Sequence, residues 1–247
     1  MKNKFVTTIE CRMTSTRLPG KVILKFGNLT SLEVLIRRIK KSKFVNHIVL
    51  ATTTNSTDNV LVDIAKKNKI GFFRGSELDV LGRLSGALKN REEKNVIQLT
   101  GDNPFIDPEV IDYMCDNFLK SRVDFLTNNG FMNIKNHFFP LGMDVSIFKR
   151  KDIIAISGIT NDSEDREHPT LFFYRSGKNK LKIKNMNVLK KWKKSFITRL
   201  TLDTKKDYLL LKEIFNHFNK KKKNIYFNLQ EIMKFLDANK KIINLNR

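Results

Sequence analysis

Hydrophobic and polar positions alternate with two different periods along the first half of the chain. Short apolar runs, typical of strands buried on both faces, occupy residues 4–11, 47–53, 71–74 and 95–100. Between these runs, apolar residues recur at helical spacing over 32–41, 60–67 and 80–89. The pair Asp107-Pro108 is a typical helix start and predicts a further helix. This alternation predicts an α/β fold in which helices cover both faces of a predominantly parallel, mixed sheet.

The second half of the chain is less regular. We expect strands at 124–127, 143–148, 181–188 and 199–202, and helices at 205–218 and 229–236. The charge run at 220–223 predicts a solvated turn between those two helices. Neither an internal repeat nor a flexible linker is visible. We therefore expect a single domain over residues 1–247, with 130–198 as its less regular region.

Composition limits the class of protein. A chain of 247 residues that is 40% hydrophobic can bury a sizeable core. Its formal net charge of +22 is also found in proteins that bind nucleic acids or anionic membranes. However, Asn, Ile and Phe are abundant beside Lys, which indicates a drift in residue usage along the whole chain. We therefore interpret most of the charge as solvated surface, and the remainder as suited to anionic substrates.

Cysteine usage and the lengths of the apolar runs favour a cytoplasmic location. Cys11 falls in a predicted buried strand and Cys115 on a predicted helix, so neither indicates a disulfide framework. No run of about eighteen apolar residues is present to span a membrane. The N-terminus lacks the apolar core of a signal peptide. We expect a cytoplasmic protein without a membrane partner.

The densest group of reactive side chains lies in the loop 12–21, directly after the first predicted strand. It combines two arginines, a lysine, three hydroxyl side chains and a glycine. Ligands of open α/β sheets bind outside the carboxyl ends of the strands, where this loop lies. Its cations, hydroxyls and backbone amides can bind phosphate oxygens. A basic surface loop is the alternative, and the loop is neither a Walker loop nor a dinucleotide-binding glycine motif.

Two aspartates follow predicted strands in the same way. Asp102 lies between Gly101 and Asn103 at the end of a buried strand, and Asp203 precedes a predicted helix. Mg²⁺ prefers hard oxygen ligands and commonly takes one or two carboxylates together with substrate phosphates. Both aspartates are therefore candidate Mg²⁺ ligands. The alternatives are a turn-capping role for Asp102 and a helix N-cap role for Asp203.

Several short blocks resemble one enzyme family. The segment 11–24 (CRMTSTRLPGKVIL) resembles the signature loop of cytidylyltransferases that activate acidic sugars, the CMP-Kdo and CMP-sialic acid synthetases, and most closely the spore-coat-polysaccharide type. Further matching blocks follow in the same order: ATTTN at 51–55, FRGSELDVLGR at 73–83, TGDNPFIDP at 100–108, LGMDV at 141–145, DREHPT at 165–170 and LDTKKD at 202–207. The resemblance spans residues 4–218 and implies a fold like that of the nucleotide-diphospho-sugar transferases.

The resemblance also implies roles for individual residues. Those that would bind the triphosphate are Arg12, Ser15, Arg17 and Lys21. The family's two metal-binding aspartates match Asp102 and Asp203, which with Arg17 and Lys21 would carry the catalysis. Segments around the nucleotide would contribute Thr52, Arg74 and Ser76. The blocks of the spore-coat type would contribute acceptor-binding residues, namely Asp144, Arg166, Glu167 and His168. The alternative for Arg166 and Glu167 is an ion pair with each other.

The activity that this resemblance implies is transfer of CMP from CTP to a sugar or sugar acid, with release of pyrophosphate, for surface polysaccharide or glycan biosynthesis. The cofactor would be Mg²⁺ and the acceptor an anionic sugar, and the region 130–198 would bind the acceptor or form a homodimer. Three alternatives remain. One is a related enzyme that uses another nucleotide, or a sugar-phosphate or phosphonate acceptor. The second is a glycosyltransferase, whose usual Asp-x-Asp motif is absent. The third is a basic nucleic-acid-binding protein, of which no zinc-finger, ribonucleoprotein or helix-turn-helix signature is found.

Overall fold

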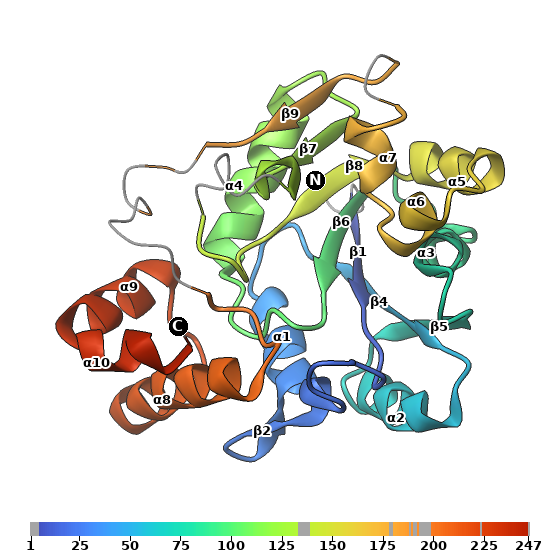
Figure 1. Cartoon of the computed structure of the whole chain (residues 1–247). Coiled ribbons are helices and arrows are strands. Elements are labelled where there is room, and N and C mark those ends of the chain that lie inside the picture. Colours follow the sequence, from blue (N-terminus) through green and yellow to red (C-terminus); the bar gives the residue numbers. More distant parts are fainter. Residues whose placement is uncertain are drawn as a thin grey trace.

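Seven strands form the central sheet of the computed structural model, which describes residues 5–132, 139–177, 180–187, 189, 192, 199–222 and 224–246. Their order across the sheet is β5-β4-β1-β6-β8-β7-β9 (Figure 1). Their bounds are β1 Phe5–Glu10, β4 His47–Thr53, β5 Gly71–Gly75, β6 Asn95–Thr100, β7 Phe125–Thr127, β8 Ser146–Lys149 and β9 Ile183–Asn185. Of these described strands only β8 runs against the others, pairing antiparallel with β6 and β7. The predicted α/β fold with a predominantly parallel, mixed sheet is confirmed.

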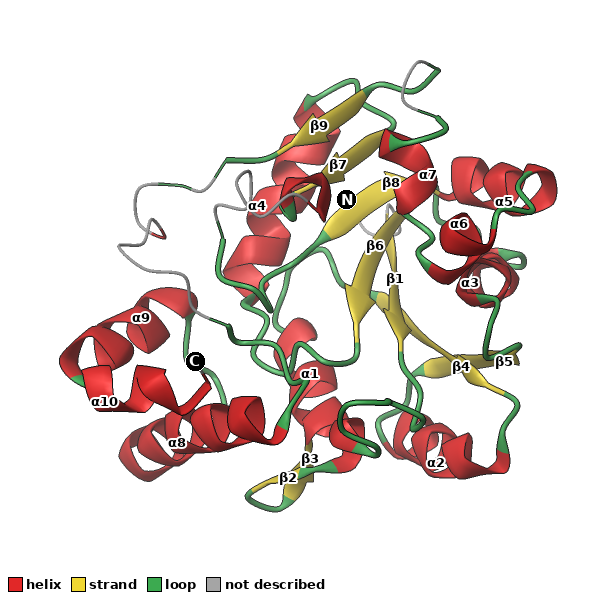
Figure 2. Cartoon of the chain, viewed as in Figure 1, coloured by secondary structure: helices red, strands yellow, loops and turns green. Residues whose placement is uncertain are grey.

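Helices cover both faces of this sheet (Figure 2). One face carries α1 Ser31–Ile39, α2 Asn59–Lys67 and α4 Pro108–Lys120, with α8 Lys205–Lys222, α9 Leu229–Ala238 and α10 Lys240–Ile243 packed beside them. The other face carries α3 Val80–Leu88, α5 Arg150–Ile159, α6 Ser163–Glu167 and α7 Leu171–Tyr174. A small hairpin, β2 Lys25–Phe26 and β3 Leu29–Thr30, leads into α1. Short 3-10 turns lie at Lys21–Ile23, Ser56–Asp58, Gly130–Met132 and Asn244–Asn246.

The alternation of side chains along β1 divides the core between the two faces. Phe5 and Ile9 are buried with α1, α2 and α4, whereas Val6 is buried with α3. Because helices cover both faces, every residue of β1 is buried. The side of Val6 continues through Thr8 to Glu10, so the strand ends with a carboxyl side chain on the face that carries α3.

The structure corrects two predictions in the second half of the chain. No strand forms at 199–202, where Arg199 makes only an isolated bridge to Leu141. The charge run at 220–223 does not begin a turn, because α8 continues to Lys222. Lysine has a good helix propensity and can extend a helix that packing has already nucleated. The helices α5, α6, α7 and α10 were not predicted.

Arg38 connects α1 to the C-terminal helices. Its side chain is fully buried, and its guanidinium donates to the carbonyls of Phe105 at 3.0 Å and Ile106 at 3.3 Å. It also donates to the carbonyls of Ile225 at 2.6 Å and Phe227 at 2.8 Å. Burial lowers the pKa of Arg38 to about 10. Four carbonyl acceptors offset the cost of removing this charge from water.

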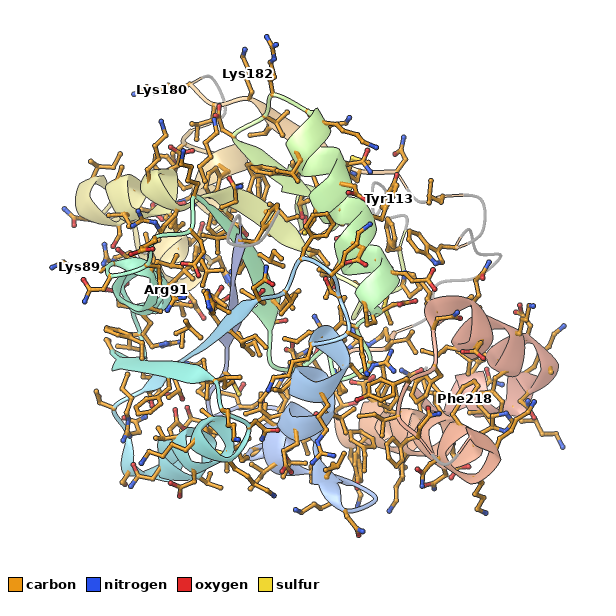
Figure 3. The ribbon with its side chains drawn as sticks, turned by 180° about the vertical axis from the view of Figure 1, so that it is seen from behind. Lys89, Arg91, Tyr113, Lys180, Lys182 and Phe218 are labelled. Carbon is orange, nitrogen blue, oxygen red and sulfur yellow. The ribbon has the colours of Figure 1, made fainter. Side chains whose placement is uncertain are left out.

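Basic side chains on the outer surface account for part of the high charge. Seen from behind, Lys89, Lys180 and Lys182 extend away from the ribbon, and all three are exposed (Figure 3). Their position agrees with the interpretation of the charge as solvated surface. Within the described parts of the chain, none of the helices combines the length and apolar character needed to span a membrane.

Candidate active site

Gly101 lets the chain cross the end of β1 and so brings Asp102 to the carboxyl end of the sheet. After β6, Gly101 passes over the end of β1, and its amide donates to the Glu10 carbonyl at 2.9 Å. A Cβ atom on Gly101 would lie 2.9 Å from both the Cβ and the Sγ of Cys11, which is too close for any other residue. Close approach of two backbones of this kind is a typical use of glycine. The crossing therefore fixes where the next residue, Asp102, leaves the sheet.

Asp102 and Asp203 share one cation. The Asp102 carbonyl accepts a hydrogen bond from the Leu202 amide at 2.7 Å, which brings Asp203 alongside. The Nζ of Lys21 lies 2.9 Å from Asp102 Oδ2 and 2.8 Å from Asp203 Oδ1. Burial disfavours the ammonium charge, but the two carboxylates outweigh it and raise the pKa of Lys21. The guanidinium of Arg17 adds a second cation 3.0 Å from Asp203 Oδ1.

The start of α8 is capped by residues other than Asp203. The Thr204 amide donates to Asp207 Oδ2 at 2.8 Å, and the Asp207 amide donates to Thr204 Oγ1 at 3.2 Å. The Asp203 carboxylate instead lies between Lys21 and Arg199, whose guanidinium is 3.2 Å from Asp203 Oδ2. Asp102 also makes a local bond, because its Oδ1 accepts from the Thr100 hydroxyl at 2.6 Å.

The two aspartates fit a magnesium ion, although they do not form a complete site. Among the described residues no group of three or more His, Cys, Asp or Glu side chains could hold a metal. Asp102 and Asp203 direct hard oxygen atoms toward the same position, that of the Lys21 ammonium. Mg²⁺ commonly takes one or two carboxylates and completes its shell with water and phosphate oxygens. The donor set therefore matches Mg²⁺ bound together with a phosphorylated substrate.

Asp58, which was not predicted as a site residue, holds the loop 12–21 against β4. Its Oδ1 accepts from the Met13 amide at 2.9 Å. Its Oδ2 accepts from the hydroxyls of Thr52 at 2.7 Å and Thr53 at 2.6 Å. Burial would raise the pKa of Asp58, but these hydrogen bonds outweigh it and lower the pKa. The only signal in the sequence was its place in the polar run that follows a buried strand.

Glu77 ties the same loop to the segment after β5. Its carboxylate accepts from the Thr14 hydroxyl and, at 2.5 Å, from the Asn55 side chain. The guanidinium of Arg12 lies 3.5 Å from Glu77 Oε1 and donates to the Glu77 carbonyl at 3.2 Å. Hydrogen bonds from Thr14 and Asn55 lower the pKa of Glu77. Ser76 is the residue predicted from this block of the sequence, and its neighbour Glu77 was not predicted.

The other residues expected around the nucleotide lie along the ends of β4 and β5 and in the loop. The Thr52 side chain is fully buried and its hydroxyl is bound to Asp58. Arg74 donates to the Thr53 carbonyl at 2.8 Å and to the Asn55 carbonyl at 2.7 Å. Ser76 is exposed. The Ser15 hydroxyl accepts from the Leu18 amide at 3.4 Å within the loop. In this structure Thr52 and Arg74 thus bind other parts of the protein, and direct contact with a nucleotide stays a prediction.

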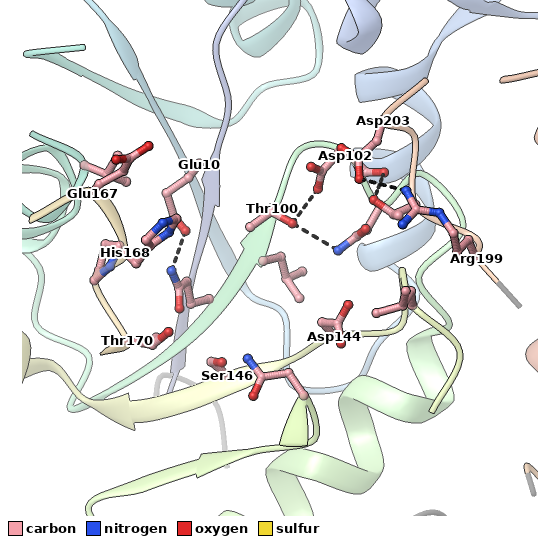
Figure 4. Close-up of a pocket in the computed structure, with 18 of the residues that line it drawn as sticks. Glu10, Thr100, Asp102, Asp144, Ser146, Glu167, His168, Thr170, Arg199 and Asp203 are labelled. Atoms are coloured by element: carbon pink, nitrogen blue, oxygen red, sulfur yellow. Dashed lines mark hydrogen bonds and ion pairs between the residues drawn. The ribbon is translucent and has the colours of Figure 1, made fainter. Parts of the chain in front are cut away.

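A pocket of about 420 Å³ opens beside the two aspartates (Figure 4). This volume is in the range that small-molecule sites occupy. The sequence-predicted residues that line it are Asp102, Asp144, Glu167, His168 and Asp203. Figure 4 shows Asp102, Asp203 and Arg199 at one end of the pocket, which we call the aspartate end. The other end, which we call the distal end, carries Glu10, Glu167, His168 and Thr170.

Arg166 lies outside the pocket lining and has a different partner from the one expected. Its guanidinium forms a two-pronged ion pair with Asp79, at 2.9 Å and 2.6 Å, rather than pairing with Glu167. It also donates to the carbonyls of Ser157 at 3.2 Å and Thr160 at 2.9 Å. Burial would raise the pKa of Asp79, but Arg166 outweighs it and lowers the pKa. Because Asp79 caps α3, Arg166 fastens α6 to the start of that helix.

A second glycine shapes the chain before Asp144. Gly142 has a φ of 98°, and a Cβ atom there would lie 2.5 Å from the carbonyl carbon of Leu200. The Gly142 amide donates to Asp144 Oδ2 at 3.1 Å. Only glycine combines this φ with so close an approach. The two backbones can therefore meet at the pocket, and Asp144 is directed into its wall.

Polar side chains form a row across the sheet beneath the pocket. Thr8, Gln98, Ser146 and Thr127 are register neighbours on β1, β6, β8 and β7. Register neighbours point to the same face of a sheet, and so does Glu10, two residues after Thr8. Gln98, Ser146 and Glu10 line the pocket. This row interrupts the apolar surface on which α3 and α5 pack, and it gives the pocket a polar floor.

Glu10 is a further site residue that sequence reasoning missed. It is 9% exposed, and its Oε2 accepts from the Gln98 side chain at 2.7 Å. Its Oε1 and the Thr8 hydroxyl are both buried without a hydrogen-bond partner among the described residues. Burial raises the pKa of Glu10 to about 7, against the lowering effects of Gln98, Thr8 and the Arg83 charge. A glutamate inside an apolar strand was the available signal.

Comparison with known proteins gives consistent matches over nearly the whole chain. The sequence profile of one family, described as cytidylyltransferase, matches residues 6–242. The chain is 32% identical over 218 residues to the spore coat polysaccharide biosynthesis protein SpsF of Bacillus subtilis, covering 86% of this chain and 87% of that protein.

Solved structures agree with these matches. A cytidylyltransferase from Leptospira borgpetersenii serovar Hardjo-bovis superimposes with a TM-score of 0.87 at 33% identity, covering 97% of this chain and 96% of that one. A CMP:2-keto-3-deoxy-manno-octonic acid synthetase in complex with CTP superimposes with a TM-score of 0.62 at 15% identity, covering 88% of this chain and 99% of that one. This second likeness is one of fold.

Proposed function

Since the chain belongs to the cytidylyltransferase family and is thus a nucleotidyltransferase, we propose that it transfers CMP from CTP to a sugar or sugar acid, with Mg²⁺, and releases pyrophosphate. One observation carries the proposal. Lys21, Asp102 and Asp203 meet at one end of a pocket with the volume of a small ligand. A cation for phosphate, two carboxylates for a metal and a cavity for an acceptor are the parts that this reaction requires.

The reaction we propose is in-line attack of an acceptor hydroxyl oxygen on the α-phosphate of the nucleotide. Such transfers depend on positioning and charge stabilisation, without a covalent enzyme intermediate. Lys21 and Arg17 would bind the phosphate oxygens and stabilise the negative charge that grows on the leaving pyrophosphate. Asp102 and Asp203 would hold Mg²⁺. When bound, Mg²⁺ supplies charge neutralisation of the phosphates and lowers the pKa of a coordinated hydroxyl.

The loop 12–21 would bind the triphosphate through Arg12, Ser15, Arg17 and Lys21. Its anchoring by Asp58 and Glu77 supports this role, because a preorganised loop loses less entropy on binding. Thr52, Arg74 and Ser76 would surround the nucleotide at the ends of β4 and β5. CTP as the nucleotide rests on the family and on the CTP complex of the fold relative. SpsF is named as a spore coat polysaccharide biosynthesis protein, and this name favours a product used in surface polysaccharide or glycan synthesis.

The pocket would bind the acceptor through Asp144, Glu167 and His168. All three line the cavity that contains the two aspartates, which supports the assignment. Arg166 would position other residues and would not bind the acceptor itself, because its guanidinium already pairs with Asp79 and donates to two carbonyls. It would hold α6, the helix that ends at Glu167 and is followed by His168.

Pyrophosphate release tests the proposal. The protein is incubated with Mg²⁺ and each of ATP, CTP, GTP and UTP, against a panel of octulosonic and nonulosonic acids, neutral sugars and sugar phosphates. We expect release with CTP, dependent on one class of acceptor and abolished by EDTA. A preference for another nucleotide would refute the base assignment, and release that survives EDTA would refute the metal.

The homodimer and the cytoplasmic location inferred from the sequence stay predictions. Light scattering coupled to size exclusion tests the first, with an expected mass of twice 28.8 kDa. Fractionation of cells that produce the chain tests the second.

A further inference from the structure

Arg199 is the one lysine or arginine among the described residues that line the pocket. The same lining carries several carboxylates, namely Glu10, Asp102, Asp144, Glu167 and Asp203. An oxyanion in the cavity would meet like charge at each of them. Apart from the imidazole of His168, which is charged only when protonated, Arg199 is thus the positive charge that the described lining offers to such a group.

Backbone contacts fix Arg199 at the aspartate end of the pocket. Its carbonyl accepts from the Asn246 side chain at 3.0 Å. The amide of the next residue, Leu200, donates to the Leu141 carbonyl at 2.7 Å. Figure 4 shows the Arg199 side chain beside Asp203, at the end of the pocket where the phosphate would react. A group bound to Arg199 therefore lies close to the proposed reacting position.

The guanidinium of Arg199 uses only part of its donor capacity. Its Nε lies 3.5 Å from Asp207 Oδ1, and its Nη2 lies 3.4 Å from Asp207 Oδ2 and 3.2 Å from Asp203 Oδ2. Charge-assisted bonds of this kind are commonly about 2.7–2.9 Å long, so these three contacts are weak. The third nitrogen, Nη1, makes no hydrogen bond to any described residue. Since the side chain is 35% exposed, Nη1 has two N–H groups to offer a ligand.

Neither aspartate depends on Arg199 alone. Asp203 Oδ1 is paired with Lys21 at 2.8 Å and with Arg17 at 3.0 Å. The Asp207 carboxylate accepts from two backbone amides, at 2.8 Å and 3.1 Å, and from a side-chain amide at 3.0 Å. Arg199 can therefore turn Nη2 toward a ligand while both carboxylates keep other partners.

We propose that Arg199 binds the anionic group of the acceptor, a carboxylate or a phosphate, through Nη1 and Nη2. This inference rests on the proposed function for the statement that the acceptor enters this pocket. A guanidinium suits both oxyanions, because its planar N–H groups can contact two oxygen atoms at once, and charge-assisted hydrogen bonds are the stronger kind. Arg199 thereby favours anionic acceptors over neutral ones.

Binding of matched ligands without nucleotide tests this inference separately from the transfer reaction. Dissociation constants are measured by ligand-observed NMR at pH 7 with Mg²⁺ present. Glucuronate, N-acetylneuraminate and 3-deoxy-manno-octulosonate are each compared with their methyl esters, and the glucose phosphates are compared with glucose. The variants are Arg199→Gln and, as a matched control, Arg122→Gln, an exposed arginine outside this pocket.

We expect at least one anion to bind the wild-type protein about tenfold or more tightly than its neutral partner, the size of one charge-assisted hydrogen bond. Arg199→Gln should bring that ratio close to one, and Arg122→Gln should preserve it. The ester pairs report on carboxylates and the glucose pairs on phosphates, so the two kinds of oxyanion are distinguished. Equal or absent binding of both members in every wild-type pair, or an anion preference that survives Arg199→Gln, would overturn the proposal.

A crystal structure provides a test that does not depend on the variant. Arg199 is the strongest of the contacts that lower the pKa of the buried Asp207, so its removal costs stability. If Arg199→Gln does not fold, crystals of the wild-type protein are soaked with the anion that binds most tightly. An oxyanion within hydrogen-bond distance of Arg199 Nη1 supports the proposal. An oxyanion held by Lys21 or Arg17 and not by Arg199 overturns it.

CTP titration of the same proteins keeps this inference distinct from the proposed function. Absent CTP binding by the wild-type protein would refute the proposed function, while the anion preference stays measurable. Weaker CTP binding by Arg199→Gln with an unchanged anion preference would assign Arg199 to the nucleotide and overturn the inference. We expect Arg199→Gln to change the anion preference and to bind CTP within about twofold of wild type, since the triphosphate is assigned to the loop 12–21.

Discussion

The ammonium of Lys21 lies 2.9 Å from Asp102 Oδ2 and 2.8 Å from Asp203 Oδ1, so one side chain occupies the position toward which both aspartates point. A divalent cation and the ammonium cannot share that position, because like charges repel strongly at contact distance. Metal binding therefore requires Lys21 to move, and the phosphate oxygens of a nucleotide offer it new partners. We expect metal and nucleotide to bind cooperatively for this reason.

Replacing Lys21 with Ala tests this coupling. The variant should bind Mn²⁺ without nucleotide about tenfold or more tightly than the wild-type protein, while kcat/KM for CTP falls by at least about tenfold, since a charge-assisted contact is worth roughly 1.5–3 kcal/mol. Mn²⁺ titration followed by electron paramagnetic resonance measures the first quantity. The control is Lys43→Ala, which removes an exposed ion pair with Asp116 elsewhere. Unchanged Mn²⁺ affinity would show that Lys21 does not compete with the metal.

Asp102→Asn should abolish turnover without unfolding the protein. The amide has nearly the volume of the carboxylate, but it removes an anionic oxygen ligand that Mg²⁺ requires. We expect kcat to fall by at least about a hundredfold at saturating Mg²⁺, with a melting temperature within a few degrees of wild type. Asp116→Asn, an exposed change on α4, is the control. Near-normal turnover in the Asp102 variant would mean that its bond with Thr100 is its whole role.

Arg17→Ala should lower the catalytic efficiency with CTP and leave the stability of the fold unchanged. Arg17 contacts Asp203 at 3.0 Å with a side chain that is 62% exposed, so its loss leaves no buried group unpaired. We expect kcat/KM for CTP to fall about tenfold and the melting temperature to stay unchanged. A rise in KM with constant kcat would show equal binding of ground state and transition state. If neither parameter changes, Arg17 is a surface residue of the loop.

A double-mutant cycle on Arg166 and Asp79 distinguishes a structural role of Arg166, which holds α6, from direct binding of the acceptor. Each single change to Ala should destabilise the protein by about 2–3 kcal/mol, because the remaining partner of this two-pronged, partly buried pair is left uncompensated. The double variant should cost less than the sum of the two. KM for the acceptor should rise to a similar degree in both single variants, since both release α6. A rise only in Arg166→Ala would instead indicate that Arg166 binds the acceptor itself.

The buried Glu10 predicts a specific pH dependence of stability. Its pKa is about 7 in the folded protein against 4.5 for the ordinary group, so the folded state holds the proton more tightly. The stabilisation is complete below pH 4.5 and is lost as the pH rises to about 7, a change of about 3 kcal/mol. Glu10→Gln cannot ionise, so its stability relative to wild type should increase over that interval. Urea unfolding of both proteins from pH 5 to pH 8 measures the difference, and parallel profiles would contradict the assignment.

The first half of the fold could be predicted because its signals are local. The run at 47–53 forms β4 with the predicted bounds, and Asp107 caps α4 by accepting from the Glu109 amide at 2.9 Å. Each of these features depends on neighbours within a few residues. The strand expected at 199–202 fails because Arg199 pairs with Leu141, far away in sequence, through a single bridge.

In the candidate site too, some residues could be predicted from local sequence signals and others could not. Asp102 and Asp203 were found because each follows an apolar run at a turn. The partner of Arg166 was not found, since sequence spacing suggests the adjacent Glu167 and cannot indicate Asp79, which caps the start of another helix. Glu10 was missed for a related reason. Its role depends on the register that sets Gln98 beside it and on the cavity above both.

The four carbonyls around Arg38 have a consequence for folding. Two of them precede α4 and two lie between α8 and α9, so the buried charge is satisfied only when both ends of the chain are in place. A chain that stops before Ile225 would retain the guanidinium with only half of its acceptors. We therefore expect such a shortened chain to lose the sharp unfolding transition of the whole protein, and the nascent chain to reach its stable state only after synthesis of the last helices.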